Sequence, residues 1–275
     1  MLRSKYPAFP YLLFMVIFIA VPLCMVAYFA FTGADGSFTT ANIVGVAAYS
    51  SVILRSLWMA FVATVISLLL GYPFAYFMAK RTTHVRRTML MLIMLPMWMN
   101  FLLRTYAWMT ILENNGLINR LLRLLGLGTL QLINTQGAVV LGMVYDYLPF
   151  MIIPLYTVLI KMDVSVIQAA QDLGGNPVEV FTRVVFPLSV PGITTGVTMV
   201  FVPAVSTFII SRMLGGGTDL MIGDLIEMQF LGNTYNPNLG GAIAFVLMVI
   251  VLFCMSVMNQ FDSNKEEQEE EGIVI

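Results

Sequence analysis

Residues 8–31 read AFPYLLFMVIFIAVPLCMVAYFAF and contain no charged side chain. A run of roughly 20 apolar residues can cross about 30 Å of hydrocarbon as a helix. This run is longer than the apolar core of a signal peptide, roughly 7–15 residues, and carries no small-residue cleavage site. We therefore expect a retained membrane helix, and with it an integral membrane protein.

The composition of the whole chain leads to the same class. Of its 275 residues 59% are hydrophobic and 11% charged, and the mean hydropathy is +0.87, whereas soluble domains carry about 25% charged residues. The 14 Lys and Arg are balanced by 15 Asp and Glu, so no basic surface for nucleic acid is expected. Cys24 and Cys254 both lie in apolar runs, which argues against a disulfide framework and a cysteine metal site. A soluble enzyme and a nucleic-acid binder are excluded.

Five further apolar runs follow the first, and none shows the alternation of a membrane barrel. The predicted fold is an all-α integral membrane protein with six transmembrane helices in residues 8–261. The predicted spans are approximately 8–31, 56–79, 88–112, 138–160, 190–211 and 239–261. A short segment, 1–7, precedes them, and an acidic tail, 262–275, follows.

The positions of Lys and Arg predict the orientation of the chain. With the N-terminus inside, nine of them fall in inner segments and five in outer segments. Most of the difference comes from the cluster at residues 80–87, KRTTHVRR. Both termini are therefore expected in the cytoplasm, and the like-charge run 266–271 of the tail is expected to be disordered.

The segment between the fourth and fifth spans, residues 161–189, is too long for a passive turn. Ser165 and Gln168 form a capping-box pattern that would start a short helix, and Gly174 with its neighbouring glycine would end it. Asn176 can cap a second helix that has Pro177 at its first position. The sequence predicts a rigid cytoplasmic projection suited to transmitting force to another protein.

Within this projection, Gln168-Ala169-Ala170, then Gly174, then Val184-Val185-Phe186-Pro187 resembles the E-A-A…G…I-x-L-P motif of the membrane subunits of bacterial ATP-binding-cassette (ABC) importers. In that family the motif forms a coupling helix that docks on a cytoplasmic ATPase. The sequence departs from the motif at Gln168, Val184 and Phe186. Gln retains the hydrogen bonding of a capping residue but not the charge. The resemblance implies a type I importer permease whose ATPase-coupling residues are Gln168, Ala169, Ala170, Asp172, Gly174 and Pro187.

A narrower resemblance concerns the substrate. The strings LRTYAW at 103–108, GLIN at 116–119, DLG at 172–174, PLSVPG at 187–192 and LMIG at 220–223 are similar to signatures of spermidine/putrescine permease subunits. This implies an assembly of two related permeases, an ATPase dimer and an extracytoplasmic polyamine-binding protein, placed in a bacterial inner membrane. Importers of other solutes share the fold and the coupling motif, so another small cation or solute stays open.

The chain contains no phosphate-binding loop, because none of its four lysines follows a glycine. It is therefore not expected to be an enzyme or to bind a cofactor, and ATP and Mg²⁺ are assigned to the partner ATPase. A self-sufficient secondary transporter or channel is an alternative compatible with six spans. The capped projection argues against it, since it has no purpose without a partner.

A polyamine needs carboxylates for its ammonium groups and aromatic faces that tolerate its methylenes. Asp146 is the acidic residue well inside a span, flanked by Tyr145 and Tyr147. These three, with Tyr106 and Trp108, are the candidate substrate path. The alternative, that Asp146 pairs with Arg104 or Arg212 as an internal strut, stays open.

Three acids, Asp219, Asp224 and Glu227, occupy the loop after the fifth span. They predict an outer acidic patch that guides a cation or contacts the binding protein, or else a merely solvated loop.

Overall fold

The protein is built from helices in the computed structural model, which describes residues 8–217, 219–232 and 234–272. The predicted cytoplasmic segment 1–7 and the last tail residues, 273–275, lie outside the described residues. Within them the only pairing of extended backbone is an isolated bridge between Thr32 and Phe38. In chain order the elements are α1 Ala8–Met15, η1 Val16–Ala20, α2 Val21–Ala30, α3 Ala41–Val46, η2 Ala47–Tyr49, α4 Ser50–Ala79, α5 Thr83–Met94, η3 Leu95–Trp98, α6 Phe101–Leu112, α7 Leu117–Leu124, α8 Gln136–Lys161, α9 Val164–Asp172, α10 Pro177–Val180, η4 Phe181–Val185, α11 Phe186–Leu188, α12 Val190–Ser206, α13 Ile209–Leu214, α14 Ile222–Leu231 and α15 Pro237–Gly272.

Four helical stretches of the described chain are long and apolar enough to cross a membrane: Pro10–Ala30, Ala41–Ala79, Gln136–Lys161 and Pro237–Met258. Two bent pairs of helices are apolar enough when each pair is taken together: Thr83–Trp98 with Phe101–Leu124, and Pro177–Leu188 with Val190–Ser206. Counted as one span each, they give six. The predicted all-α membrane fold is confirmed.

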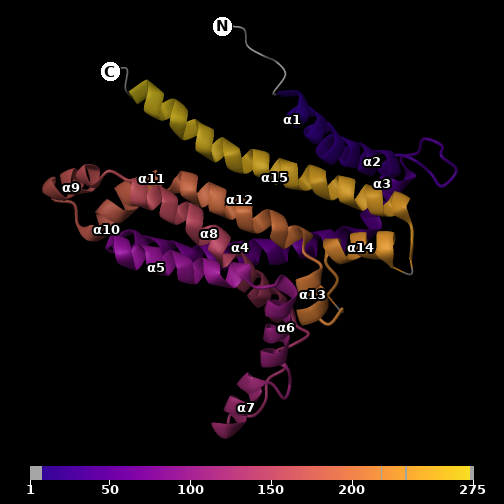
Figure 1. Cartoon of the computed structure of the whole chain (residues 1–275), viewed down its shortest axis with the longest axis horizontal. Helices are drawn as coiled ribbons and strands as arrows, with labels where there is room; N and C mark the ends of the chain where they lie inside the picture. The colour runs from indigo at the N-terminus through magenta and orange to yellow at the C-terminus, as the bar shows by residue number, and fades with distance from the viewer. Residues whose placement is uncertain (1–7, 218, 233, 273–275) are drawn as a thin grey trace.

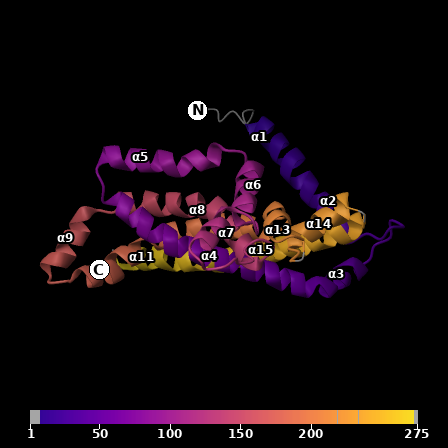
Figure 2. The same ribbon diagram turned by 90° about the horizontal axis from the view of Figure 1, so that it is seen from below.

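The predicted span 88–112 is not one continuous helix. The chain turns by 91° between Trp98 and Phe101, so that α6 runs across the end of α5 (Figure 2). Asn100 causes the break, because its side chain accepts hydrogen bonds from the backbone N–H groups of Leu102 and Leu103 and starts a new helix. Pro96, inside the preceding η3, has no N–H to donate.

The predicted span 190–211 is also interrupted. Helix α12 ends at Ser206, and Thr207 is extended with φ −64° and ψ 142°. Helix α13 then begins at Ile209. Pro203, inside the last turn of α12, removes a backbone donor there, so a single helix through residue 211 does not form.

The centre of the bundle is made by α4, α8 and α12, which lie side by side in Figure 1. Small residues allow this close packing: a Cβ placed on Gly196 of α12 would lie 2.8 Å from Sδ of Met151 of α8. From the other side, a Cβ on Gly71 of α4 would lie 3.0 Å from Met151. Membrane helices associate through such small residues, because lipid offers no hydrophobic drive for helix pairing.

Helix α15 crosses the length of the molecule beside α2 and continues to Gly272 (Figure 1). The expectation of a disordered tail is therefore wrong for residues 262–272, whose backbone is helical. Glu, Gln and Lys, which make up most of this stretch, are good helix formers, and that propensity favours extending the helix.

Candidate functional site

The segment predicted to couple to an ATPase forms a projection at one end of the molecule, with α9 at its extremity (Figures 1 and 2). Helix α9 begins two residues earlier than expected, because Asp163 caps it in place of Ser165 by accepting the N–H of Ser165 at 2.9 Å. This hydrogen bond lowers the pKa of the Asp163 carboxyl. The predicted Ser165–Gln168 capping box is thus corrected to an Asp163 cap.

Two glycines form the sharp turn between α9 and α10. Gly174 has φ +87°, a left-handed conformation that L side chains rarely adopt, and its N–H bonds to the carbonyl of Gln171. A Cβ on Gly175 would lie 2.7 Å from the carbonyl oxygen of Ala170. Asn176 then caps α10 in a capping box with Glu179, as predicted.

Most of the predicted coupling residues are accessible. Gln168, Ala169, Asp172 and Gly174 are exposed, whereas Ala170 and Pro187 are half-buried. Large apolar side chains stand out beside them: Leu173 is 89% exposed, Val178 70% and Val166 45%. An apolar tip outside the predicted spans has no lipid to cover it, and such patches mark protein-binding sites.

The base of the projection is held firmly against the membrane helices. The ring of Phe181 packs edge-on against Tyr72 and Tyr76 of α4, at centroid distances of 5.7 and 5.5 Å. The hydroxyl of Tyr72 lies 2.9 Å from Oγ of Ser189, at the junction of α11 and α12. A force on α9 would therefore reach both α4 and α12.

The intramembrane carboxylate has a partner on another helix. Nη1 of Arg104 on α6 lies 3.3 Å from Oδ1 of Asp146 on α8, and the two residues are 8% and 3% exposed. Neither atom has a hydrogen-bond partner among the described residues. Of the two predicted strut partners the structure selects Arg104, because Arg212 pairs with Glu227 instead.

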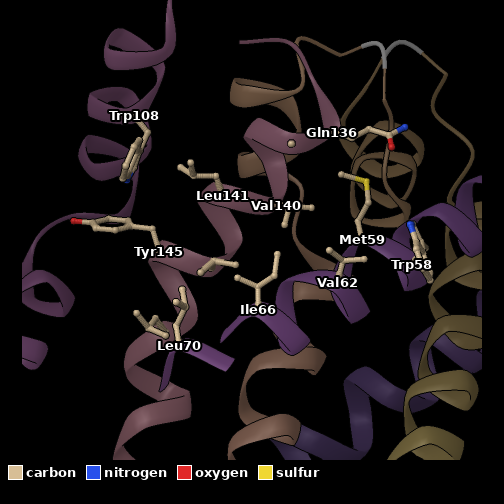
Figure 3. Close-up of a pocket in the computed structure, with 13 residues that line it drawn as sticks. Trp58, Met59, Val62, Ile66, Leu70, Trp108, Gln136, Val140, Leu141 and Tyr145 are labelled. Carbon is tan, nitrogen blue, oxygen red and sulfur yellow. The ribbon is translucent and has the colours of Figure 1, made fainter. Parts of the chain in front are cut away.

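The predicted path residues separate into two groups. Trp108 and Tyr145 pack edge-on, with centroids 5.4 Å apart, in the wall of a cavity of about 710 Å³ between α4, α6 and α8 (Figure 3). Tyr147 turns elsewhere and donates to the carbonyl of Pro203 at 3.5 Å. Tyr106 is half-exposed on α6, and Asp146 does not line the cavity.

The cavity is mostly apolar, with Trp58 and Gln136 at the side opposite Trp108 and Tyr145 (Figure 3). Its lining consists of Trp58, Met59, Val62, Ile66, Leu70, Trp108, Gln136, Gly137, Val140, Leu141, Val144, Tyr145 and Leu148. Such a wall can accept methylene groups and offer aromatic faces to a cation.

The three outer acids do not make one exposed patch. Asp219 pairs with Arg55 at 3.0 Å and also accepts from Nε2 of Gln136. Glu227 pairs with Arg212. Asp224 is only 1% exposed, and its Oδ2 accepts from Ser211 at 2.7 Å and from the N–H of Met221 at 2.8 Å. Burial raises the pKa of the Asp224 carboxyl.

Sequence reasoning overlooked these pairings because no local pattern specifies which polar or charged side chains will meet. Arg55 and Asp219 are separated by 164 positions, and Tyr72 and Ser189 by 117. No local pattern signals such contacts. Even the nearer pairs, Ser211 with Asp224 at 13 positions and Arg212 with Glu227 at 15, join two different helices, α13 and α14.

Comparison with known proteins assigns the chain to a family. Residues 71–262 match the family model described as binding-protein-dependent transport system inner membrane component. The chain is 36% identical over 268 residues to the spermidine/putrescine transport system permease protein PotB of Haemophilus influenzae, covering 93% of both chains. It is 40% identical over 205 residues to PotB of Escherichia coli, covering 74% of both.

A solved structure shares the fold. A chain of a bacterial ABC transporter that imports the acidic polysaccharide alginate superposes with a TM-score of 0.72 at 18% identity, covering 91% of this chain and 93% of that one. The predicted importer permease fold is confirmed. The match to a family of binding-protein-dependent transport components argues against a self-sufficient transporter or channel. The chain is a multi-pass inner-membrane permease subunit, not an enzyme. It belongs to the family of inner membrane components of binding-protein-dependent ABC importers.

Proposed function

We propose that this chain is one permease subunit of an ATP-driven importer of polyamines, coupled to a separate ATPase through α9 and the turn that follows it. The observation that carries the coupling is the α9–α10 projection, which exposes Leu173 and Val178 at its tip. Its base packs on α4 through Phe181. An exposed apolar tip on a rigid base can both bind a partner and transmit its movement.

ATP and Mg²⁺ belong to the partner ATPase in this proposal, since the chain has no phosphate-binding loop. An ATPase dimer, a second homologous permease and an extracytoplasmic binding protein complete the assembly. The binding protein is the feature that names the family, and the polyamine is named for the two PotB relatives.

The proposed substrate path uses both groups of candidate residues. The Trp108–Tyr145 wall would receive the methylene chain, and Asp146 would meet an ammonium group. Asp146 has a lone pair to offer, because its Oδ1 has no hydrogen-bond partner within the described chain. An ammonium group would then share or displace the contact with Arg104. Another small cation remains the second candidate, since these groups recognise charge rather than chain length.

Crosslinking tests the coupling. Leu173→Cys, in a chain whose two native cysteines are replaced, should form a crosslink with the ATPase in the assembled complex. Val44→Cys is the matched control: this residue is 71% exposed on α3, far from α9 (Figure 1). Equal crosslinking at both positions, or none at Leu173, would contradict the coupling.

An uptake assay tests the proposed polyamine substrate. Proteoliposomes holding the complete assembly and its binding protein should take up labelled spermidine or putrescine only with internal ATP. Uptake driven by an ion gradient alone, or ATP-driven uptake of a different solute with no response to polyamine, would overturn the assignment.

A further inference from the structure

Helix α7 has a leucine face that no other part of the described chain covers. Leu117, Leu121 and Leu124 recur at helical spacing, and they are 69%, 57% and 84% exposed. Leu125, directly after the helix, is 64% exposed on the same side. Removing leucine side chains from water is favourable in proportion to the apolar area buried, so four exposed leucines favour an apolar environment.

Two arginines lie beside this leucine face. Arg120 and Arg123 are exposed, and each is fixed by the preceding loop: Nε of Arg120 donates to the carbonyl of Asn115 at 3.0 Å, and Nη2 of Arg123 donates to Oδ1 of Asn115 at 3.1 Å. The ion pairs found in the described residues involve other arginines. Both guanidinium groups therefore present a positive charge without a carboxylate partner.

The third face of α7 fixes the helix to its own loops. Asn119 is fully buried, donates to the carbonyls of Glu113 and Leu130, and accepts from the N–H of Leu130 at 2.8 Å. These three hydrogen bonds of Asn119 fix which side of α7 faces outward. The leucine face is therefore part of a defined structure.

The arm formed by α6 and α7 leaves the bundle sideways (Figure 1). It turns by 91° from Thr83–Trp98, and the loop of residues 125–135 connects it to the predicted outer end of α8 at Gln136. A helix perpendicular to a membrane span lies along the membrane plane. The arm thus places α7 level with the outer surface of the bilayer.

We infer that α7 is an interfacial anchor in the outer phospholipid surface, with its leucines among the acyl chains and Arg120 and Arg123 at the lipid phosphates. An amphipathic helix with leucines on one side and arginines on the other binds membranes in this way. Charge complementarity favours lipid over a protein partner: the leucine face offers no hydrogen-bonding side chain, and the two cations beside it match the phosphates of every phospholipid.

Nitroxide accessibility in the assembled transporter tests this inference. The full chain, without its native cysteines and combined with its partner subunits, is placed in nanodiscs of phosphatidylethanolamine and phosphatidylglycerol. A label at Leu121→Cys or Leu124→Cys should relax more with oxygen, which concentrates in lipid, than with a water-soluble nickel chelate. A label at Asn114→Cys, an exposed polar loop position, should show the opposite order.

Two double variants test whether Arg120 and Arg123 hold the helix at the lipid phosphates. Replacing Arg120 and Arg123 together by Gln should move the Leu121 label toward water, whereas replacing both by Lys should leave its depth unchanged. A Leu121 label reached better by the nickel chelate overturns the anchor. A label shielded from both reagents shows a protein cover instead and overturns it as well. An unchanged depth in the Gln variant overturns the role of the phosphates.

Discussion

The hydroxyl of Tyr72 on α4 lies 2.9 Å from Oγ of Ser189, where the α9–α10 projection joins α12. Ser189 donates its own proton to the carbonyl of Phe186 at 2.7 Å, so Tyr72 is the donor in the pair. This buried contact ties the base of the projection to a helix that is 117 positions away in sequence.

Removing that hydroxyl should weaken coupling without dismantling the fold. Tyr72→Phe keeps the ring that packs on Phe181 and deletes one hydrogen bond, worth about 1 kcal/mol. We expect a small drop in melting temperature and more ATP hydrolysed per polyamine imported. Ser189→Ala, which leaves the Tyr72 hydroxyl unpaired, should destabilise more, by about 1–3 kcal/mol. An unchanged ratio of ATP to substrate in both variants would remove the contact from the coupling route.

Gly174 supplies a second prediction. Its φ of +87° disfavours any residue with a Cβ, by about 1–2 kcal/mol, and a larger side chain would also stand on the proposed docking face. Gly174→Leu should abolish uptake while the chain still inserts into the membrane, and Gly174→Asn, which tolerates this conformation better, should lose less. Gly36→Leu is the control, because Gly36 has φ +78° and equally open space in the loop after α2. Loss of uptake in both Leu variants would point to general misfolding.

Variants of the Arg104–Asp146 pair distinguish a structural ion pair from a contact with the substrate. Removing one member of a buried pair leaves an uncompensated charge, at about 3–5 kcal/mol, so Asp146→Asn and Arg104→Gln should each lower the amount of folded chain. The double variant should recover that amount. If Asp146 meets the polyamine, uptake by the double variant stays about tenfold or more below wild type, corresponding to ~1.4 kcal/mol. Restored uptake would make the pair a strut.

The buried carboxyl of Asp224 should make the stability of the folded chain depend on pH. Burial raises its pKa above the ordinary 3.8, so the folded chain holds the proton more tightly than the unfolded chain. Its contribution is therefore most favourable at low pH and is lost as pH rises from the unfolded pKa through the folded one. Asp224→Asn keeps an acceptor for Ser211 and Met221 without the charge. Melting curves should show Asn more stable than Asp at pH 7, with the advantage shrinking toward pH 4. An advantage independent of pH would contradict the raised pKa.

The sequence predicted the α9–α10 turn almost completely, because its causes are local. Asn176, Pro177 and Glu179 act on backbone groups within three positions, and Gly174 acts on its own dihedral angles. The break at Asn100 also has a local cause, but the residues on both sides of Asn100 are apolar, so the sequence was interpreted as one continuous span. The spacing of apolar residues reports which side of a helix is hydrophobic. It does not detect a side chain that caps a helix by bonding to nearby backbone N–H groups.

The amino-acid sequence by itself determined the membrane class, the approximate positions of the apolar helices, the α9–α10 projection and the family motif, because length, apolarity and capping act over short distances along the chain. Only the tertiary structure decided that Asp146 faces Arg104, that Asp219 and Glu227 are neutralised by arginines, and that Asp224 is buried. A charge has no preferred partner until folding places one within a few ångströms. Which acids stay free for a cation is therefore a property of packing and not of composition.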